Sequence, residues 1–275
     1  MVRAELLKLR TVTGTWVALA IGVLGLLLTQ VLTITVLPAI ASGVIPGADI
    51  GDELGNLDPG SLGFQVAALN VLGGGGNSLG SVSITAIVVL ILGLLVATTD
   101  YRFGGIVSTA LAEPRRWRIL GGKTAATAVT AALLGVVLSV ICLGTLLVST
   151  AVLPGVDLVV PAPDIAFTLM RGIAVVVLFA LLGLAIGTLV RSQLAGVLVV
   201  IALLFVEPIL QGLAQLLTGA VPLWAQLLPL SLGLSAIAGA DAGLAIPPAV
   251  ALLALAGIVA LLLGLAGTVL RRRDL

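Results

Sequence analysis

Two residues with ionisable side chains, Arg171 and Glu207, stand within long apolar stretches of this sequence. A charge at membrane depth is costly, so such residues usually form pairs or line the path of a substrate. Counted along the helices expected below, both fall in the same half of the membrane and could reach each other. We favour a structural ion pair, or contacts with lipid head groups near a helix end, over the handling of a substrate or proton.

Residues for catalysis are otherwise scarce, because the chain contains no histidine and one cysteine, Cys142. The usual Ser–His pair and most zinc sites are therefore excluded. Ser78, within Gly76–Gly80, fits the pattern of a nucleophile elbow, but it has no base and follows no strand. The run from Gly121 to Thr124 resembles the end of a P-loop, but a tryptophan stands where the first glycine is required. We expect no catalytic, cofactor or metal site, and hence no enzyme.

The composition is that of a membrane protein. Hydrophobic residues make up 60% of the 275 positions and charged residues 9%, whereas soluble proteins carry about 25% charged residues. Apolar runs of about 20 residues predict an all-α integral membrane protein with six transmembrane helices. Gly183 and Gly187 stand one turn apart in the fourth span and would permit close helix packing. The expected spans are residues 16–37, 82–99, 125–148, 165–190, 194–213 and 249–270.

Two further segments belong to the same membrane domain, which we expect to cover residues 1–275. In residues 1–13, Val2, Leu6 and Leu9 share one helical face, which predicts a short helix on the membrane surface. Residues 214–248 are apolar but repeatedly interrupted by glycine and proline. Such a segment is tolerated at membrane depth only where protein or water covers it, so we expect short re-entrant or interfacial helices on the outer side.

Charge predicts the orientation. Six spans place both ends of the chain on one side, together with every one of the 13 lysines and arginines except Arg171. Cytoplasmic loops of membrane proteins carry an excess of basic residues. Both termini are therefore expected in the cytoplasm.

The connection between the second and third spans carries clustered positive charge and a helical pattern. Its apolar residues recur at i, i+3, i+4, i+7 and i+8, one face of a short helix over residues 103–111. Pro114 closes this helix, because a proline moves the preceding residue out of the helical region. The segment is either a solvated loop with an interfacial helix or a helix that docks on a soluble partner. Its apolar face consists of Phe103, Ile106, Val107, Ala110 and Leu111.

Three parts of the chain resemble the permeases of ABC-2 type transporters. One is the segment Ala4–Thr11 that leads to Trp16, and another is the ending Arg272-Arg273-Asp274-Leu275. The third, between spans two and three, is the most specific. The family usually has Glu at the position of Asp100 and Thr at that of Gly105. This part reads Asp100-Tyr101-Arg102-Phe103-Gly104-Gly105-Ile106, then Pro114-Arg115-Arg116-Trp117-Arg118 and Lys123.

The resemblance implies the membrane subunit of a bacterial ABC exporter in the cytoplasmic membrane. Such a subunit pairs with a second permease copy, identical or paralogous, and with two separate ATPase subunits that bind ATP and magnesium. Residues 103–111 would be the coupling helix that inserts into the ATPase. Hydrophobic drugs, antimicrobial peptides and lipid-linked molecules all remain open as substrates, and no nucleic acid is implied. The implied docking residues are Asp100, Tyr101, Arg102, Phe103, Ile106, Val107, Ala110, Leu111, Arg115 and Arg116.

Two other classes of function fit the residues. One is a secondary transporter or channel, driven by an ion gradient, that uses Arg171 and Glu207 as a coupling pair. The other is a membrane scaffold that holds a cytoplasmic partner and transports nothing. Dependence of transport on ATP distinguishes the exporter from the first class, and any transport at all distinguishes it from the second.

Overall fold

The structure is a computed structural model that describes residues 2–44, 58–73, 83–102, 116–219, 221–238 and 246–272. Within these ranges every regular element is helical. Five of the helices are long and apolar enough to cross a membrane, so this part of the chain is an all-helical, multi-pass membrane protein. The five are Thr13–Ala41, Trp117–Val152, Ala162–Val190, Gln193–Thr218 and Pro248–Leu270.

The first of these helices is longer than the predicted span of residues 16–37. It runs from α2 (Thr13–Gln30) through a π-helical turn (Val31–Val36) into α3 (Leu37–Ala41). A π-helical turn shifts carbonyl groups out of the regular bonding pattern. Here the hydroxyl of Ser149 donates a hydrogen bond to the carbonyl oxygen of Ile34, at 2.7 Å.

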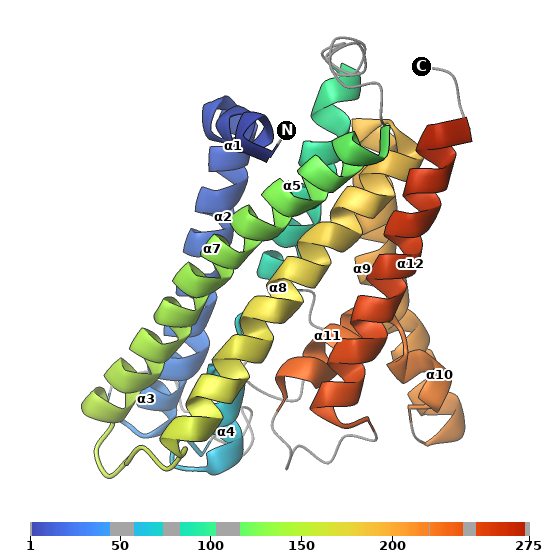
Figure 1. The fold of residues 1–275 in the computed structure, drawn as a ribbon. Coiled ribbons are helices and arrows are strands. Elements are labelled where there is room, and N and C mark those ends of the chain that lie inside the picture. The colour runs from blue at the N-terminus through green and yellow to red at the C-terminus, as the bar shows by residue number, and fades with distance from the viewer. Residues whose placement is uncertain are drawn as a thin grey trace.

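A separate helix, α1 (Val2–Thr11), precedes the first span, as the sequence predicts for residues 1–13. Val12 interrupts the chain between them with an extended backbone, φ −81° and ψ 115°. Figure 1 shows α1 lying across the end of α2 rather than continuing it. Leu9 of α1 is buried, whereas Leu7 is exposed. This geometry suits a helix that lies along a membrane surface when α2 crosses the membrane.

The centre of the bundle is a close crossing of α5 (Ile84–Arg102) and α8 (Ala162–Val190). A Cβ added at Gly93 would overlap the carbonyl oxygen of Ala180, and one at Gly183 would overlap that of Leu90. A Cβ at Gly187 would lie 2.7 Å from the Cβ of Ala97. The close packing predicted from Gly183 and Gly187 is therefore confirmed, and its partner is α5.

The helix α5 corresponds to the predicted span at residues 82–99. Its apolar part, Ile84–Asp100, is shorter than the five long helices. At 1.5 Å per residue these 17 residues extend for about 26 Å, close to the thickness of the hydrocarbon core.

The long helix α7 begins earlier than predicted. The sequence suggested a polar connection up to Lys123 and a span at residues 125–148, but α7 covers Arg116–Val152. A hydropathy pattern predicts only the part of a helix that lies in lipid, whereas the backbone hydrogen bonds of the helix can continue beyond that part. With 37 residues, α7 is about 55 Å long, well over the thickness of a hydrocarbon core. The helix is therefore longer than the apolar layer needs, and Lys123 lies two turns from its start.

The helix α9 (Gln193–Thr218) also exceeds its predicted span, which ended at residue 213. Pro208 lies inside this helix. A proline removes one backbone hydrogen bond, and membrane helices tolerate this loss. The helix ends at Gly219, which has a left-handed conformation with φ 73°. The last long helix, α12 (Pro248–Arg272), covers the predicted span at residues 249–270.

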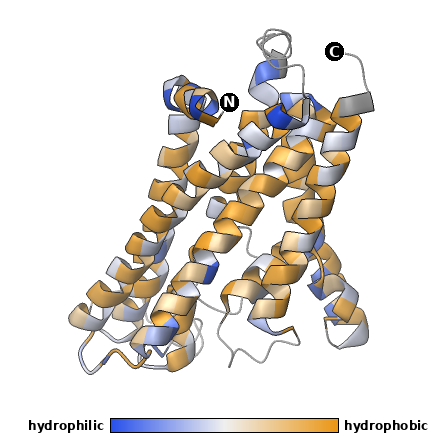
Figure 2. Cartoon of the chain, viewed as in Figure 1, coloured by the Kyte–Doolittle hydropathy of each residue, from blue (hydrophilic) through white to orange (hydrophobic). Residues whose placement is uncertain are grey.

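Two short helices, α10 (Leu223–Gln226) and α11 (Pro229–Ile237), lie between α9 and α12. The second packs into the bundle, where a Cβ at Gly233 would lie 2.5 Å from the ring of Phe179 on α8. Short helices were expected in this segment. Figure 2 shows apolar residues along the long helices and hydrophilic residues gathered at α1 and at helix ends.

Candidate functional site

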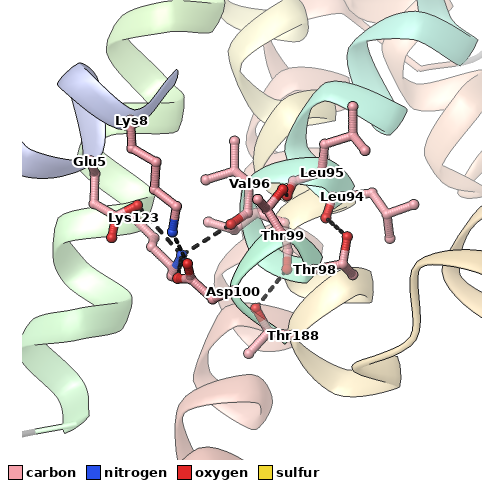
Figure 3. Close-up of polar contacts among 11 residues, drawn as sticks. Glu5, Lys8, Leu94, Leu95, Val96, Thr98, Thr99, Asp100, Lys123 and Thr188 are labelled. Atoms are coloured by element: carbon pink, nitrogen blue, oxygen red, sulfur yellow. Dashed lines mark hydrogen bonds and ion pairs between the residues drawn. The ribbon is translucent and has the colours of Figure 1, made fainter. Parts of the chain in front are cut away.

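Lys123 lies at the centre of a cluster of charges near the end of the bundle that carries α1 (Figure 3). Its Nζ is 2.5 Å from Oδ2 of Asp100, in an ion pair whose geometry is not that of a hydrogen bond. The same Nζ is 3.4 Å from Oε2 of Glu5 and donates a hydrogen bond to the carbonyl oxygen of Val96, at 3.0 Å. The whole residue is only 5% exposed.

Lys8 completes the cluster by pairing with the other carboxylate oxygen of Asp100. The cluster of Glu5, Lys8, Asp100 and Lys123, called the ion network below, thus contains two carboxylates and two ammonium groups. Asp100 is 2% and Glu5 7% exposed. Buried charges require partners, since an uncompensated charge in a low-dielectric interior is strongly unfavourable. Because the two negative and two positive charges balance, the cluster can be buried.

Three elements far apart in the sequence supply the ion network. Glu5 and Lys8 are three residues apart and lie on one side of α1. Asp100 lies in the last turn of α5, and Lys123 lies two turns into α7. The ammonium group of Lys123 is also favoured by the negative end of the α5 dipole, where it reaches the carbonyl of Val96.

Two hydroxyl groups near the ion network, those of Thr98 and Thr188, are satisfied within their own helices. Thr98 donates to the carbonyl of Leu94 at 2.9 Å, and Thr188 donates to that of Leu184 at 2.8 Å (Figure 3). Neither needs a charged partner, so the carboxylates of the network are left to the lysines.

The pKa of Lys8 is lowered from its ordinary value of 10.5, mainly because burial removes the ammonium group from water. The nearby charge of Lys123 lowers the pKa further, while Glu5 raises it. The side chain of Lys8 is nevertheless 33% exposed. It is therefore the member of the network that solvent reaches.

The predicted docking residues lie beside this network or outside the described residues. Asp100 belongs to the network, and a contact between Asp100 and another protein would require its ion pairs to open. Tyr101 and Arg102 complete α5, and Arg116 begins α7. The predicted coupling helix at residues 103–111, with its neighbour Arg115, lies outside the described residues and stays a prediction.

Glu207, predicted as an intramembrane charge, is only 3% exposed and binds the start of α11. Its Oε2 accepts a hydrogen bond from the backbone N–H of Leu230 at 3.0 Å, and its Oε1 accepts one from Ser231 at 2.6 Å. Gln211, one turn along α9, contacts the hydroxyl of Ser231 and donates to the carbonyl of Ala225 at 3.2 Å. The first N–H groups of a helix have no partners within it, and its positive end attracts a carboxylate. Glu207 therefore caps α11.

Arg171, the other intramembrane charge, bonds to its own helix. Its Nη2 donates to the hydroxyl of Thr168 at 3.2 Å, and its Nε donates to the carbonyl of Phe167 at 3.3 Å. In the described part of the chain no ion pair joins Arg171 to Glu207. Of the two structural roles expected from the sequence, the ion pair is therefore not formed, and both oxygens of Glu207 accept backbone N–H groups of α11 instead; the expected contact with lipid head groups stays a prediction.

Two buried glutamines were not identified from the sequence. Gln30, 1% exposed on α2, donates to the carbonyl of Ala68 at 2.9 Å and to the sulfur of Cys142 at 3.1 Å. Gln65, fully buried on α4 (Leu62–Ala68), donates to the carbonyl of Asp157 at 2.7 Å and accepts from the N–H of Val159 at 2.9 Å. These residues are called the amide anchors below. Gln30 holds the end of α4 against α2 and α7, and Gln65 holds the loop around Asp157 and Val159 against α4.

Sequence signals for the missed residues do exist. Lys8 and Lys123 are the only lysines in the chain, and both belong to the ion network. Gln30 is a polar side chain within a predicted span, a position that usually has a specific partner. Neither signal identifies the partner.

No protein-family model matches this sequence, and no curated protein is similar to it.

Proposed function

We propose that this protein is the permease subunit of an ATP-driven exporter of the ABC-2 type. In this proposal six helices cross the bacterial cytoplasmic membrane, with both termini in the cytoplasm and α5 as the second span. A second permease copy completes the substrate pathway, and two ATPase subunits dock on residues 103–111. ATP would be bound and hydrolysed by those partners.

The observation that carries the proposal is the ion network at the base of the 103–115 connection. Asp100 precedes this connection and Lys123 follows it, and the two are joined to each other and to α1. A coupling element has to pass a displacement to the transmembrane helices. With both flanks clamped to α1, movement of the connection would displace α1, α5 and α7 together.

The sequence of the connection supports the same function. Phe103, Ile106 and Val107 begin the apolar face of the predicted helix, and arginines flank it. Apolar anchors at helical spacing suit a groove on another protein, and flanking charges steer its approach. The resemblance to ABC-2 permeases is most specific in this same stretch.

Co-purification from membranes tests the proposal. We expect an ATPase with a P-loop to accompany the wild-type protein and to be lost when Ile106→Glu and Val107→Glu are introduced together. The matched control is Ser108→Glu with Thr109→Glu, which places the same charges on the opposite face of the predicted helix and should keep the ATPase. The proposal is refuted if no such ATPase binds, or if both pairs of substitutions act alike.

The gradient-driven alternative has less support. A coupling pair of Arg171 and Glu207 needs carboxylate oxygens that can change partners. Both oxygens of Glu207 instead accept backbone hydrogen bonds at the start of α11. Transport that follows an ion gradient without ATP would revive this alternative.

A further inference from the structure

The short helix α1 has two different sides. One side faces the protein, where Glu5 and Leu9 are buried and Lys8 joins the ion network. On the other side, Arg3, Leu7 and Arg10 follow one another at i, i+4 and i+7, and all three are exposed. Neither arginine forms an ion pair with a described residue.

Trp16 connects this exposed side to the part of α2 that faces lipid. The indole Nε1 donates a hydrogen bond to the carbonyl oxygen of Arg10 at 2.8 Å, and the residue is 57% exposed. From Trp16, a stripe of exposed residues follows α2 at intervals of four, through Ala20 and Leu24 to Leu28. Since α2 is long and apolar enough to span the membrane, we expect this exposed apolar stripe to face acyl chains. Tryptophan is enriched where acyl chains meet head groups.

We propose that the outer side of α1, formed by Arg3, Leu7 and Arg10 with Trp16, binds the head groups of anionic phospholipids. Guanidinium groups bind phosphate oxygens in a bidentate manner. Leu7, 62% exposed between the two arginines, is placed to enter the boundary of the acyl layer. The only carboxylate on α1, that of Glu5, is turned into the protein, so nothing on the outer side repels a negative head group.

An anionic lipid fits this surface better than an acidic soluble protein does. The hydrogen bond from Trp16 fixes the Arg10 end of α1 beside the lipid-facing stripe of α2, at the depth of the head groups. A bound lipid would hold α1 at the membrane surface, and the opposite side of α1 is tied to Asp100 and Lys123. Lipid binding would thus stabilise the arrangement of the ion network. This inference does not rest on ATPase docking, because the protein alone suffices to test it.

Fluorescence quenching at Trp16 provides the test. Trp117→Phe and Trp224→Phe leave Trp16 as the single tryptophan of the full chain. This protein is placed in phosphatidylcholine nanodiscs that contain increasing fractions of brominated phosphatidylglycerol or brominated phosphatidylcholine, whose bromines quench tryptophan on contact. We expect brominated phosphatidylglycerol to bind about tenfold more tightly at this site, and less so at high salt.

Substitutions make the test specific. Arg3→Gln with Arg10→Gln should bring the preference for phosphatidylglycerol close to one, whereas Arg3→Lys with Arg10→Lys should keep most of it. Arg118→Gln with Arg271→Gln removes two charges from the same end of the molecule and should leave the preference unchanged.

The proposal is overturned if the two lipids quench equally in the single-tryptophan protein, or if the control pair loses as much preference as the α1 pair. Equal quenching would favour a soluble acidic partner for this surface. The comparison of lipids and salt in the single-tryptophan protein with all its arginines decides the matter even where an arginine variant does not fold. Loss of the ATPase in co-purification would leave this result unaffected.

Discussion

The two ends of the bundle are held together by different chemistry. At one end, the ion network joins three helices through charged side chains that contact one another. At the other end, the amide anchors Gln30 and Gln65 bind mainly backbone carbonyl and N–H groups. The first arrangement depends on protonation and on a complete set of charges. The second depends on neither: Gln65 fixes a loop, and Gln30 links α2 to α4 and α7 through uncharged groups.

The comparison indicates where each kind of contact is useful. A buried amide satisfies irregular backbone without a net charge, which suits a fixed loop. Ion pairs between helix ends can separate and form again when the ends become exposed to water. If the exporter function is correct, the movable end is the one that faces the ATPase.

Breaking the ion network at its centre should have the largest effect. Lys123→Met leaves Asp100 and Glu5 buried without this partner, and we expect the free energy of unfolding to fall by about 3–5 kcal/mol. Chemical unfolding in detergent, followed by circular dichroism, measures the change. Adding Asp100→Asn to this variant should recover part of the loss. If the free energy of unfolding falls by less than about 1 kcal/mol, the network contributes little to stability. That result would contradict the cost expected for an unpaired buried charge.

Removing an amide anchor should cost less and should not depend on pH. Gln65→Leu deprives Asp157, Val159 and neighbouring backbone groups of their partner, for an expected loss of about 2–3 kcal/mol. Hydrogen exchange of residues 153–160 should increase at pH 6 and at pH 8 alike. Protection that changes with pH, or that persists in the variant, would contradict the assignment of Gln65 as the anchor of this loop.

The anchor at Gln30 should show a smaller effect with a chemical readout. Gln30→Leu removes the donor to Ala68 and to the sulfur of Cys142, and we expect a loss of about 1–2 kcal/mol. Cys142, the only cysteine, is buried and should react more quickly with a membrane-permeant maleimide once local packing loosens. Gln65→Leu is the matched comparison, because it disturbs the same end of the molecule without touching the thiol. Equal labelling rates in Gln30→Leu and the wild type would argue against the contact.

The smallest effect is expected at Lys8, where solvent screens the charge. Its folded-state pKa lies below the unfolded value, so the folded protein releases this proton first. Stability should therefore rise with pH across the range between the lowered pKa and the ordinary value of 10.5. Lys8→Gln should remove that slope, as measured by unfolding at pH 8 to 10.

Labelling of lysines provides an independent check of the same network. With an amine-reactive reagent, Lys8 should be modified before Lys123, because Lys123 is only 5% exposed. Mass spectrometry distinguishes the two sites easily, since the chain has no other lysine. Equal modification of both would contradict the burial of Lys123.

Much of the fold follows from the sequence, but helix ends do not. Apolar runs predict where chain lies in lipid, and five of the six expected spans coincide with long helices. The limits of α7 and α9 differ because backbone hydrogen bonds continue beyond the apolar layer. Pro208 lies within α9, since a single missing bond does not end a helix that neighbours support.

The sequence predicts which residues of the site are unusual, but not which groups they contact. Arg171 and Glu207 stand out as charges among apolar residues, but nothing in the side chain of Glu207 indicates that its partner is the backbone of α11. Likewise, Lys8 and Asp100 are separated by more than 90 positions along the chain. Spacing rules describe residues within one helix and do not reveal contacts between helices.

The glycine crossing of α5 and α8 has a mechanical consequence. At Gly93 and Gly183 the two backbones touch without intervening side chains, so neither helix can slide or rotate against the other without carbonyl oxygens colliding. We therefore expect α5 and α8 to move together as one rigid unit. We expect a force applied at Asp100 to reach the far end of α8 through this contact, and the less buried helices α2, α9 and α12 to move relative to the pair.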